Sequence, residues 1–198
     1  MGRFWVGSKA HDNTSGAGSL FRVDLDGTVT RVRTGLTIAN GLGWGPDGTT
    51  MYVTDSGAGT IDAHDYDVES GRLGPPRAFL RLPAEEGSPD GLTVDADGCL
   101  WVAVWGGSEV RCYAPDATLV TRVQVGASHV TSCAFVGAGL ENLAITTAQD
   151  ELTAEQLERE PDAGKLHLAG SAGRGTASHS SAVRPGLRLT RSREGDAR

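Results

Sequence analysis

Two oxygen-bearing side chains, Asn40 and Asp90, stand at matching places in two copies of one short motif. Each is followed by Gly-Leu, and each motif leads into a short apolar run. Amide and carboxylate oxygens are ligands that hard divalent cations such as Ca²⁺ prefer. Taken singly, each residue also suits a simple turn, because Asn and Asp before Gly favour turns. Their shared position in the motif favours the joint interpretation, in which both side chains bind one cation.

The motif belongs to a longer repeat of short strands. In the second copy, Leu92–Val94 and Leu100–Val104 flank an Asp-Ala-Asp-Gly turn. This pattern predicts a β-hairpin, because Asp-Gly tolerates the positive φ of tight hairpins. The same order occupies residues 40–56, a weaker copy occupies residues 132–147, and half a copy, Gly2–Gly7, opens the chain. A period of roughly 40–50 residues with several strands is typical of a β-propeller blade.

The repeats predict an all-β chain with an incomplete propeller over residues 1–168. They account for roughly three to four blades, whereas a closed ring needs about four to eight. An open series exposes strand edges, so we expect possible self-association through them. Inner strands surround the propeller axis, so Asn40 and Asp90 should approach one point. Residues 169–198 are rich in Gly, Ser and Arg and show neither alternation nor a helical period, which predicts a disordered tail.

Composition and charge narrow the classes of partner. The net charge is −7, and the tail holds six Arg against two acidic residues, so the body is more acidic than the whole chain. An acidic body argues against nucleic acid as the main partner. Apolar runs are too short to cross a bilayer and no charged-then-apolar leader opens the chain, so we expect no membrane partner and a cytoplasmic location. Cys99, Cys112 and Cys133 lack metal-type spacing, which predicts buried, reduced thiols.

Other polar residues carry weaker signals. His11 and Asp12 lie in a polar loop where a substrate lid could sit, although a solvated loop is the simpler interpretation. His129 precedes a predicted inner strand, and a structural role is favoured there. The Asp-rich segments 24–27 and 95–98 lack the Glu that an EF-hand loop requires, so we interpret them as hairpin turns. The four Trp residues occupy strand positions and should pack between blades.

Seven segments, in this order, carry a likeness to a known family. They are Gly-Arg-Phe-Trp-Val-Gly at 2–7, Ile-Ala-Asn-Gly-Leu-Gly-Trp at 38–44, Met-Tyr-Val-Thr-Asp-Ser at 51–56, Ile-Asp-Ala-His-Asp-Tyr-Asp at 61–67, Ser-Pro-Asp-Gly-Leu-Thr-Val-Asp-Ala-Asp-Gly at 88–98, Leu-Trp-Val-Ala at 100–103 and Thr-Ser-Cys-Ala-Phe at 131–135. Through them the chain resembles senescence marker protein 30 (regucalcin), the gluconolactonases and related sugar-lactone hydrolases. The resemblance extends over about residues 2–168.

The resemblance implies a six-bladed β-propeller with one divalent metal at the mouth of the central channel. In that family an Asn of the Asn-Gly-Leu motif and the Asp of the Pro-Asp-Gly motif bind the metal, and these match Asn40 and Asp90. Ca²⁺ is the expected ion, with Zn²⁺ or Mn²⁺ as alternatives. A third ligand, a Glu, and the Arg and Asn that hold the substrate lie nearer the family's N-terminus. We therefore expect this chain to be a C-terminal portion of the fold.

The activity that the resemblance implies is metal-dependent hydrolysis of a small-molecule sugar lactone. The metal would polarise the ester carbonyl and stabilise the developing oxyanion. Asp90 would be the catalytic residue, because its carboxylate could accept a proton from the attacking water. The alternative is a non-catalytic, truncated propeller that binds calcium or a partner. Turnover is expected to be low without the missing ligand segment and to return with it, which separates the two hypotheses.

Overall fold

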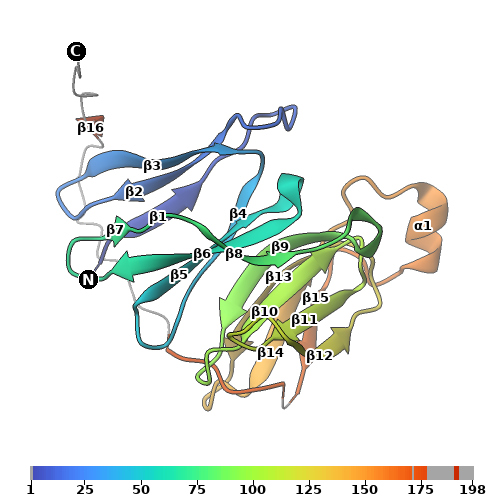
Figure 1. The fold of residues 1–198 in the computed structure, drawn as a ribbon. Coiled ribbons are helices and arrows are strands. Elements are labelled where there is room, and N and C mark those ends of the chain that lie inside the picture. The colour runs from blue at the N-terminus through green and yellow to red at the C-terminus, as the bar shows by residue number, and fades with distance from the viewer. Residues whose placement is uncertain (1, 171, 178–189, 192–198) are drawn as a thin grey trace.

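The computed structural model describes residues 2–170, 172–177 and 190–191 (Figure 1). Nearly all regular structure in these residues is antiparallel strand, arranged as four successive sheets. We number these sheets blades 1 to 4 in chain order. Each corresponds to one predicted repeat, which confirms the prediction of an all-β, incomplete propeller. No helix in the described part of the chain is long and apolar enough to span a bilayer.

The strands of each blade follow one another along the chain, except for one late addition to blade 1. Blade 1 contains β1 (Phe4–Gly7), β2 (Gly18–Val23), β3 (Thr28–Leu36) and β16 (Thr190–Arg191). Blade 2 contains β4 (Ala39–Trp44), β5 (Thr50–Asp55), β6 (Thr60–Asp67), β7 (Arg72–Leu73) and β8 (Arg77–Arg81). Blade 3 contains β9 (Ser88–Val94), β10 (Leu100–Trp105), β11 (Glu109–Tyr113) and β12 (Leu119–Gln124). Blade 4 contains β13 (Val130–Val136), β14 (Asn142–Thr147) and β15 (Leu166–Ala169), with helix α1 (Ala154–Arg159) in its long loop.

The Asp-Gly segments form hairpin turns, as the sequence predicts. Between β9 and β10, the Asp95 side chain accepts the backbone N–H groups of Asp97 and Cys99 at 3.0 and 2.8 Å. Gly98 has a φ of 84°, in the left-handed region that Gly adopts without a steric penalty. These contacts explain why the Asp-Ala-Asp-Gly sequence reverses the chain tightly and brings β10 back beside β9.

The core consists of three apolar layers, each of which lies between two consecutive blades. Trp5, Leu20, Leu36, Met51 and Val53 join blades 1 and 2. Tyr52, Ile61, Ala63, Leu92, Val94, Leu100, Val102 and Tyr113 join blades 2 and 3. Trp101, Ala103, Val110, Cys112, Val130, Cys133, Leu143 and Ile145 are among the residues that join blades 3 and 4. Burial of these faces orders the blades in sequence and holds β9 between β4 and β13.

The Trp residues contact aromatic rings, in keeping with their predicted packing role. Trp5 of blade 1 and Trp44 of blade 2 both meet Tyr66 edge to face, with ring centroids 6.0 and 6.2 Å apart. Trp101 of blade 3 meets Phe135 of blade 4 at 5.8 Å in the same geometry. Edge-to-face pairs of this kind add to the free energy gained from burial alone.

A buried charge network stabilises the outer part of blade 3. The Glu109 carboxylate, which is 3% exposed, accepts hydrogen bonds from Arg111 Nε at 2.5 Å, Arg122 Nη1 at 3.0 Å and Gln124 Nε2 at 2.7 Å. Arg111 also pairs with Glu86 at 2.5 Å. Every charge in the network therefore has a partner, as burial requires.

Blade 1 carries an additional strand at its outer edge. β3 extends to Leu36, and β16 pairs with it in parallel. An edge strand presents unpaired N–H and C=O groups, so any extended segment that reaches it can add to the sheet.

The start of the predicted tail also contacts the body. The Arg174 carbonyl accepts the Ala96 N–H at 2.8 Å, and Gly175 forms a bridge with Asp95. The described parts of 169–198 thus make contacts that the prediction of a disordered tail did not include. Residues 178–189 and 192–198 lie outside the described residues, and the prediction is not tested there.

Candidate metal centre

The structure brings Asn40 and Asp90 together on adjacent inner strands. Asn40 lies on β4 and Asp90 on β9, and the backbones of these strands touch at Gly41. A Cβ atom on Gly41 would lie 2.5 Å from the Asp90 carbonyl oxygen, which only a residue without a side chain permits. The Asn40 side chain also lies close enough to the Asp90 carboxylate to lower its pKa. The two residues therefore meet as the repeat register predicts, while their role as metal ligands stays a prediction.

Both residues lie in β-bulges, which the sequence analysis did not anticipate. In blade 2, Ala39 pairs with Asp55 and Leu42 pairs with Val53. Between these two pairs, β4 has two residues, Asn40 and Gly41, whereas β5 has only one. A bulge interrupts the regular alternation of a strand and changes the direction of a side chain, and such bulges occur often beside active sites.

Blade 3 repeats this irregularity at the equivalent place. Pro89 pairs with Val104 and Leu92 with Val102, so the Asp90–Gly91 pair opposes Ala103 alone. Two consecutive blades thus bulge at the residue pair that begins with the candidate ligand. The coincidence indicates that the backbone, and not only the choice of side chain, is adapted at these positions.

Thr131 holds the corresponding position in blade 4, and the sequence analysis missed it. Val130 pairs with Thr147 and Ser132 with Thr146, which leaves Thr131 as the extra residue of a third bulge. A Cβ atom on Gly91 would lie 2.8 Å from the Thr131 carbonyl oxygen, so β9 and β13 also touch here. Alignment of the weaker repeat with the Asp90 motif was the signal that could have revealed Thr131.

The environment of Asp90 disfavours its ionised form. Burial raises the pKa of Asp90 to about 6, while hydrogen bonds from the Asn40 side chain and the Gly91 backbone partly oppose the shift. None of the ion pairs found among the described residues involves Asp90. A bound cation would supply the positive charge that this desolvated carboxylate lacks.

Asn40 is held by a contact that leaves its carbonyl oxygen available. Its Nδ2 donates to Ser56 Oγ at 3.1 Å. The neighbouring Asp55 carboxylate accepts the N–H groups of Thr37 and Ile38, each at 2.9 Å, and so fixes the chain as it enters β4. These contacts position the amide on the inner strand before any ligand arrives.

The weaker candidates from the sequence have structural roles or stand apart. The Asp12 carboxylate accepts the backbone N–H and the hydroxyl of Thr14 within its own loop, and these hydrogen bonds lower the pKa of Asp12. His129 stacks on Trp105 with ring centroids 4.0 Å apart, and its Nδ1 lies 2.8 Å from the Asp150 carbonyl oxygen. The structural role favoured for His129 agrees with these contacts.

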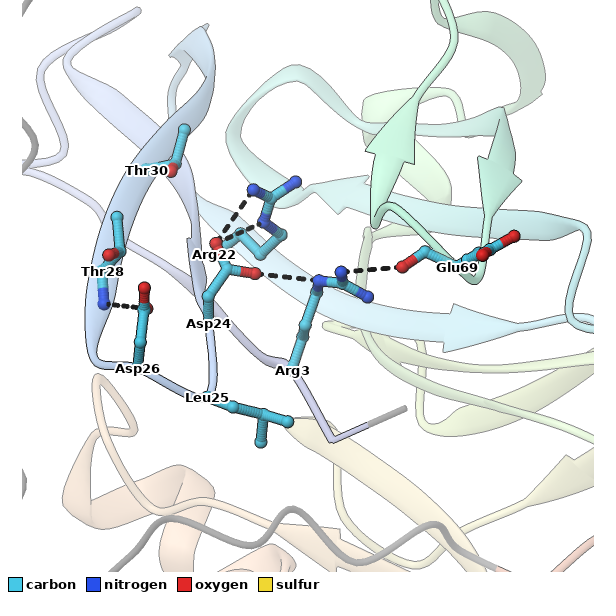
Figure 2. Close-up of a pocket in the computed structure, with 8 residues that line it drawn as sticks. All are labelled: Arg3, Arg22, Asp24, Leu25, Asp26, Thr28, Thr30 and Glu69. Atoms are coloured by element: carbon cyan, nitrogen blue, oxygen red, sulfur yellow. Dashed lines mark hydrogen bonds and ion pairs between the residues drawn. The ribbon is translucent and has the colours of Figure 1, made fainter.

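An open pocket of about 500 Å³ lies elsewhere, where the turn after β2 meets the β6–β7 turn. Figure 2 shows its lining residues, which are Arg3, Arg22, Asp24, Leu25, Asp26, Thr28, Thr30 and Glu69. Arg3 Nε and Arg22 Nη2 bind opposite oxygens of Asp24 at 2.8 and 2.9 Å, and Arg3 Nη2 donates to the Glu69 carbonyl at 2.8 Å. Asp24 and backbone carbonyl groups thus occupy both guanidinium groups, and the cluster joins blades 1 and 2.

Comparisons with known proteins show the family of this chain. The family model described as the SMP-30/Gluconolactonase/LRE-like region matches residues 1–149. Pentonolactonase XacC of Haloferax volcanii is 42% identical over 147 residues, which cover 74% of this chain and 50% of that protein. Regucalcin of Gallus gallus is 33% identical over 169 residues, which cover 82% of this chain and 56% of that protein.

The solved structure of a calcium-binding regucalcin from Agrobacterium tumefaciens superposes with a TM-score of 0.87 at 28% identity. The match covers 91% of this chain and 61% of that one. Fold and site together define a β-propeller protein whose inner strands bring oxygen-bearing side chains to one place. The chain belongs to the SMP-30/gluconolactonase/LRE-like family, which includes sugar-lactone hydrolases. It spans about half the length of the curated relatives that it matches.

Proposed function

We propose that this chain takes part in the metal-dependent hydrolysis of a sugar lactone, with Asn40 and Asp90 as ligands of one divalent cation. The observation that carries the proposal is the close approach of the two adjacent inner strands at Gly41 and Asp90, which brings Asn40 near the Asp90 carboxylate. Named relatives that act on lactones supply the reaction class. The proposal includes a small-molecule substrate and, because the three cysteines are free thiols, a location in the reducing cytoplasm.

The residues present fit a hard cation. Asp90 contributes a carboxylate and Asn40 an amide oxygen, and Ca²⁺ takes six to eight oxygen ligands of this kind. Two side chains are few for Ca²⁺, so water and substrate oxygens would complete the shell. Mn²⁺ also accepts oxygen donors, whereas Zn²⁺ more often binds nitrogen and sulfur. Ca²⁺ is therefore our first choice.

The chemistry follows from the position of the carboxylate. When bound, a divalent cation supplies polarisation of the lactone carbonyl and compensation for negative charge on its oxygen. Asp90 would accept a proton from the water that attacks the carbonyl, because its carboxylate would lie beside the cation and the polarised lactone. The ring C–O bond would then break, the leaving ring oxygen would take the proton from Asp90, and the product would be a hydroxy acid. Asn40 would act as the neighbouring ligand of the same cation.

The test is acid release from gluconolactone, followed with a pH indicator in the presence of added Ca²⁺, Mn²⁺ or Zn²⁺. Asp90→Ala should abolish metal-stimulated turnover, and Asn40→Ala should reduce it. Asp116→Ala is the matched control, because Asp116 is an exposed turn residue of blade 3 whose carboxylate accepts only a local N–H from Thr118. Turnover in Asp90→Ala equal to that of the parent would remove the catalytic assignment. Metal binding without turnover that persists when the missing ligand segment is restored would favour the non-catalytic, calcium-binding alternative.

A further inference from the structure

A second group of potential metal ligands lies in blade 3, at the turn where β9 meets β10. It consists of Asp95 in the turn, Cys99 just before β10 and Cys112 on β11. One carboxylate oxygen and the two sulfur atoms all lie within 4.8 Å of one another. Cys112 pairs directly with Trp101, and Cys99 precedes Trp101 by two residues. The two cysteines are therefore diagonal neighbours on the same face of the hairpin.

We propose that Asp95, Cys99 and Cys112 form a metal site for a thiophilic divalent cation of the Zn²⁺ type, with water as a fourth ligand. Two thiolates and one carboxylate are a donor set that Zn²⁺ accepts in tetrahedral geometry, and sulfur donors disfavour Ca²⁺. The site is distinct from the Asn40–Asp90 pair, whose donors are all oxygen. This proposal does not depend on the proposed lactone chemistry.

Hydrogen bonds already orient the carboxylate of this site. Asp95 Oδ1 accepts the N–H groups of Asp97 and Cys99, and Oδ2 accepts Trp101 Nε1 at 2.9 Å. Oδ2 has one such donor and retains a lone pair for a metal. Partners of this type fix a ligand's direction and raise metal affinity. The turn, the indole and the carboxylate thus form a support that exists before metal binding.

The charge balance also permits a metal in this partly buried position. Both sulfur atoms belong to free cysteines. Binding of M²⁺ to two thiols releases two protons as two sulfur–metal bonds form, so the net charge of the site does not change.

The site is accessible from one side. Cys99 is only partly buried, whereas Cys112 is 2% exposed. The backbone of residues 172–175 crosses the turn, and a Cβ atom on Gly173 would lie 3.6 Å from Asp95 Oδ2. Because Gly173 has no side chain, this segment covers the turn without filling the space beside the carboxylate.

The proposal is tested by titrating the reduced protein with Co²⁺, whose bonds to thiolates give an intense charge-transfer absorption in the near ultraviolet. The parent should show this band at one equivalent, and Zn²⁺ should displace it whereas excess Ca²⁺ should not. Cys99→Ser and Cys112→Ser should each weaken Co²⁺ binding by about 100-fold or more, since loss of a mere supporting partner costs roughly 10–100-fold. The band should survive in Asp90→Ala.

Cys133→Ser is the matched control. Cys133 is as buried as Cys112, but its thiol donates to the Trp101 carbonyl and stands outside the cluster. A parent without the band would overturn the proposal, as would an unchanged band in Cys99→Ser or an equal loss in Cys133→Ser. Circular dichroism verifies that each variant is folded. If Cys112→Ser does not fold, Co²⁺ binding by Cys99→Ser alone tests the proposal, because Cys99 is partly exposed.

Discussion

Replacing Gly41 with Ala should force apart the two inner strands that carry Asn40 and Asp90. A Cβ atom at position 41 would lie 2.5 Å from the Asp90 carbonyl oxygen and 2.9 Å from the Leu92 nitrogen. Both are backbone atoms, so no change of rotamer relieves the overlap. Ordinary contact begins at 3.4 Å, so the strands must separate by up to about 0.9 Å.

Two measurements report this separation. Overpacking of this kind costs about 1–3 kcal/mol of unfolding free energy. For a chain of this size, each 1 kcal/mol lowers Tm by about 2–4 °C, so thermal unfolding should shift down by about 2–12 °C. Metal sites tolerate displacements of only about 0.2 Å, so calorimetric titration should show Ca²⁺ affinity reduced by about tenfold or more.

Gly126→Ala is the control for this experiment. A Cβ atom at position 126 meets no atom within 4 Å, and Gly126 does not have a positive φ. The control should keep both the parent's Tm and its Ca²⁺ affinity. If Gly41→Ala behaves as the control does, β4 and β9 do not meet as described, and the geometric basis for joining Asn40 to Asp90 is lost.

Three further predictions concern pH, buried charge and the strand edges. Because the pKa of Asp90 is raised from 3.8 to about 6, its contribution to the stability of the metal-free chain is complete below pH 3.8 and is lost as pH rises through 6. Protons compete with Ca²⁺ below pH 6, so calorimetry should show affinity falling about tenfold for each pH unit there, and a flat profile would contradict the assignment. Glu109→Ala removes one of the two carboxylates that pair with the buried Arg111 and should lower the unfolding free energy by about 3–5 kcal/mol in urea denaturation, whereas a change below about 1 kcal/mol would show that the network is dispensable. Leu166 and Leu168 are 70% and 67% exposed on the edge strand β15, so replacing both with Lys should reduce self-association in light scattering; an already monomeric parent would refute this.

The repeat made much of the fold predictable. Asp-Gly turns and short apolar runs locate the hairpins, and the shared register of Asn40 and Asp90 places both on inner strands. Their meeting follows from propeller geometry, because consecutive inner strands are neighbours. Local sequence, however, does not determine the three bulges, since a bulge is a property of two paired strands. The bulge at Thr131 is therefore seen only in the pairing of β13 with β14.

The Cys99–Cys112 pair and β16 show the same limit of local patterns. The two thiols are separated in sequence and meet only as diagonal neighbours across β10 and β11, so the spacing of the cysteines gave no metal signal. β16 has two residues and joins β3 from the far end of the chain. Such contacts depend on which strand edges and sheet faces are free in the folded chain. A short segment of sequence does not contain that information.

The central claim is that Asn40 and Asp90 bind one divalent cation together. Calorimetric titration of Ca²⁺ into the parent, Asn40→Ala, Asp90→Ala and the control Asp116→Ala tests it most directly. The predicted result is one weakly bound equivalent in the parent and in Asp116→Ala, reduced affinity in Asn40→Ala and no binding in Asp90→Ala. A parent that binds no Ca²⁺, or an Asp90→Ala variant that binds it as the parent does, would contradict the claim.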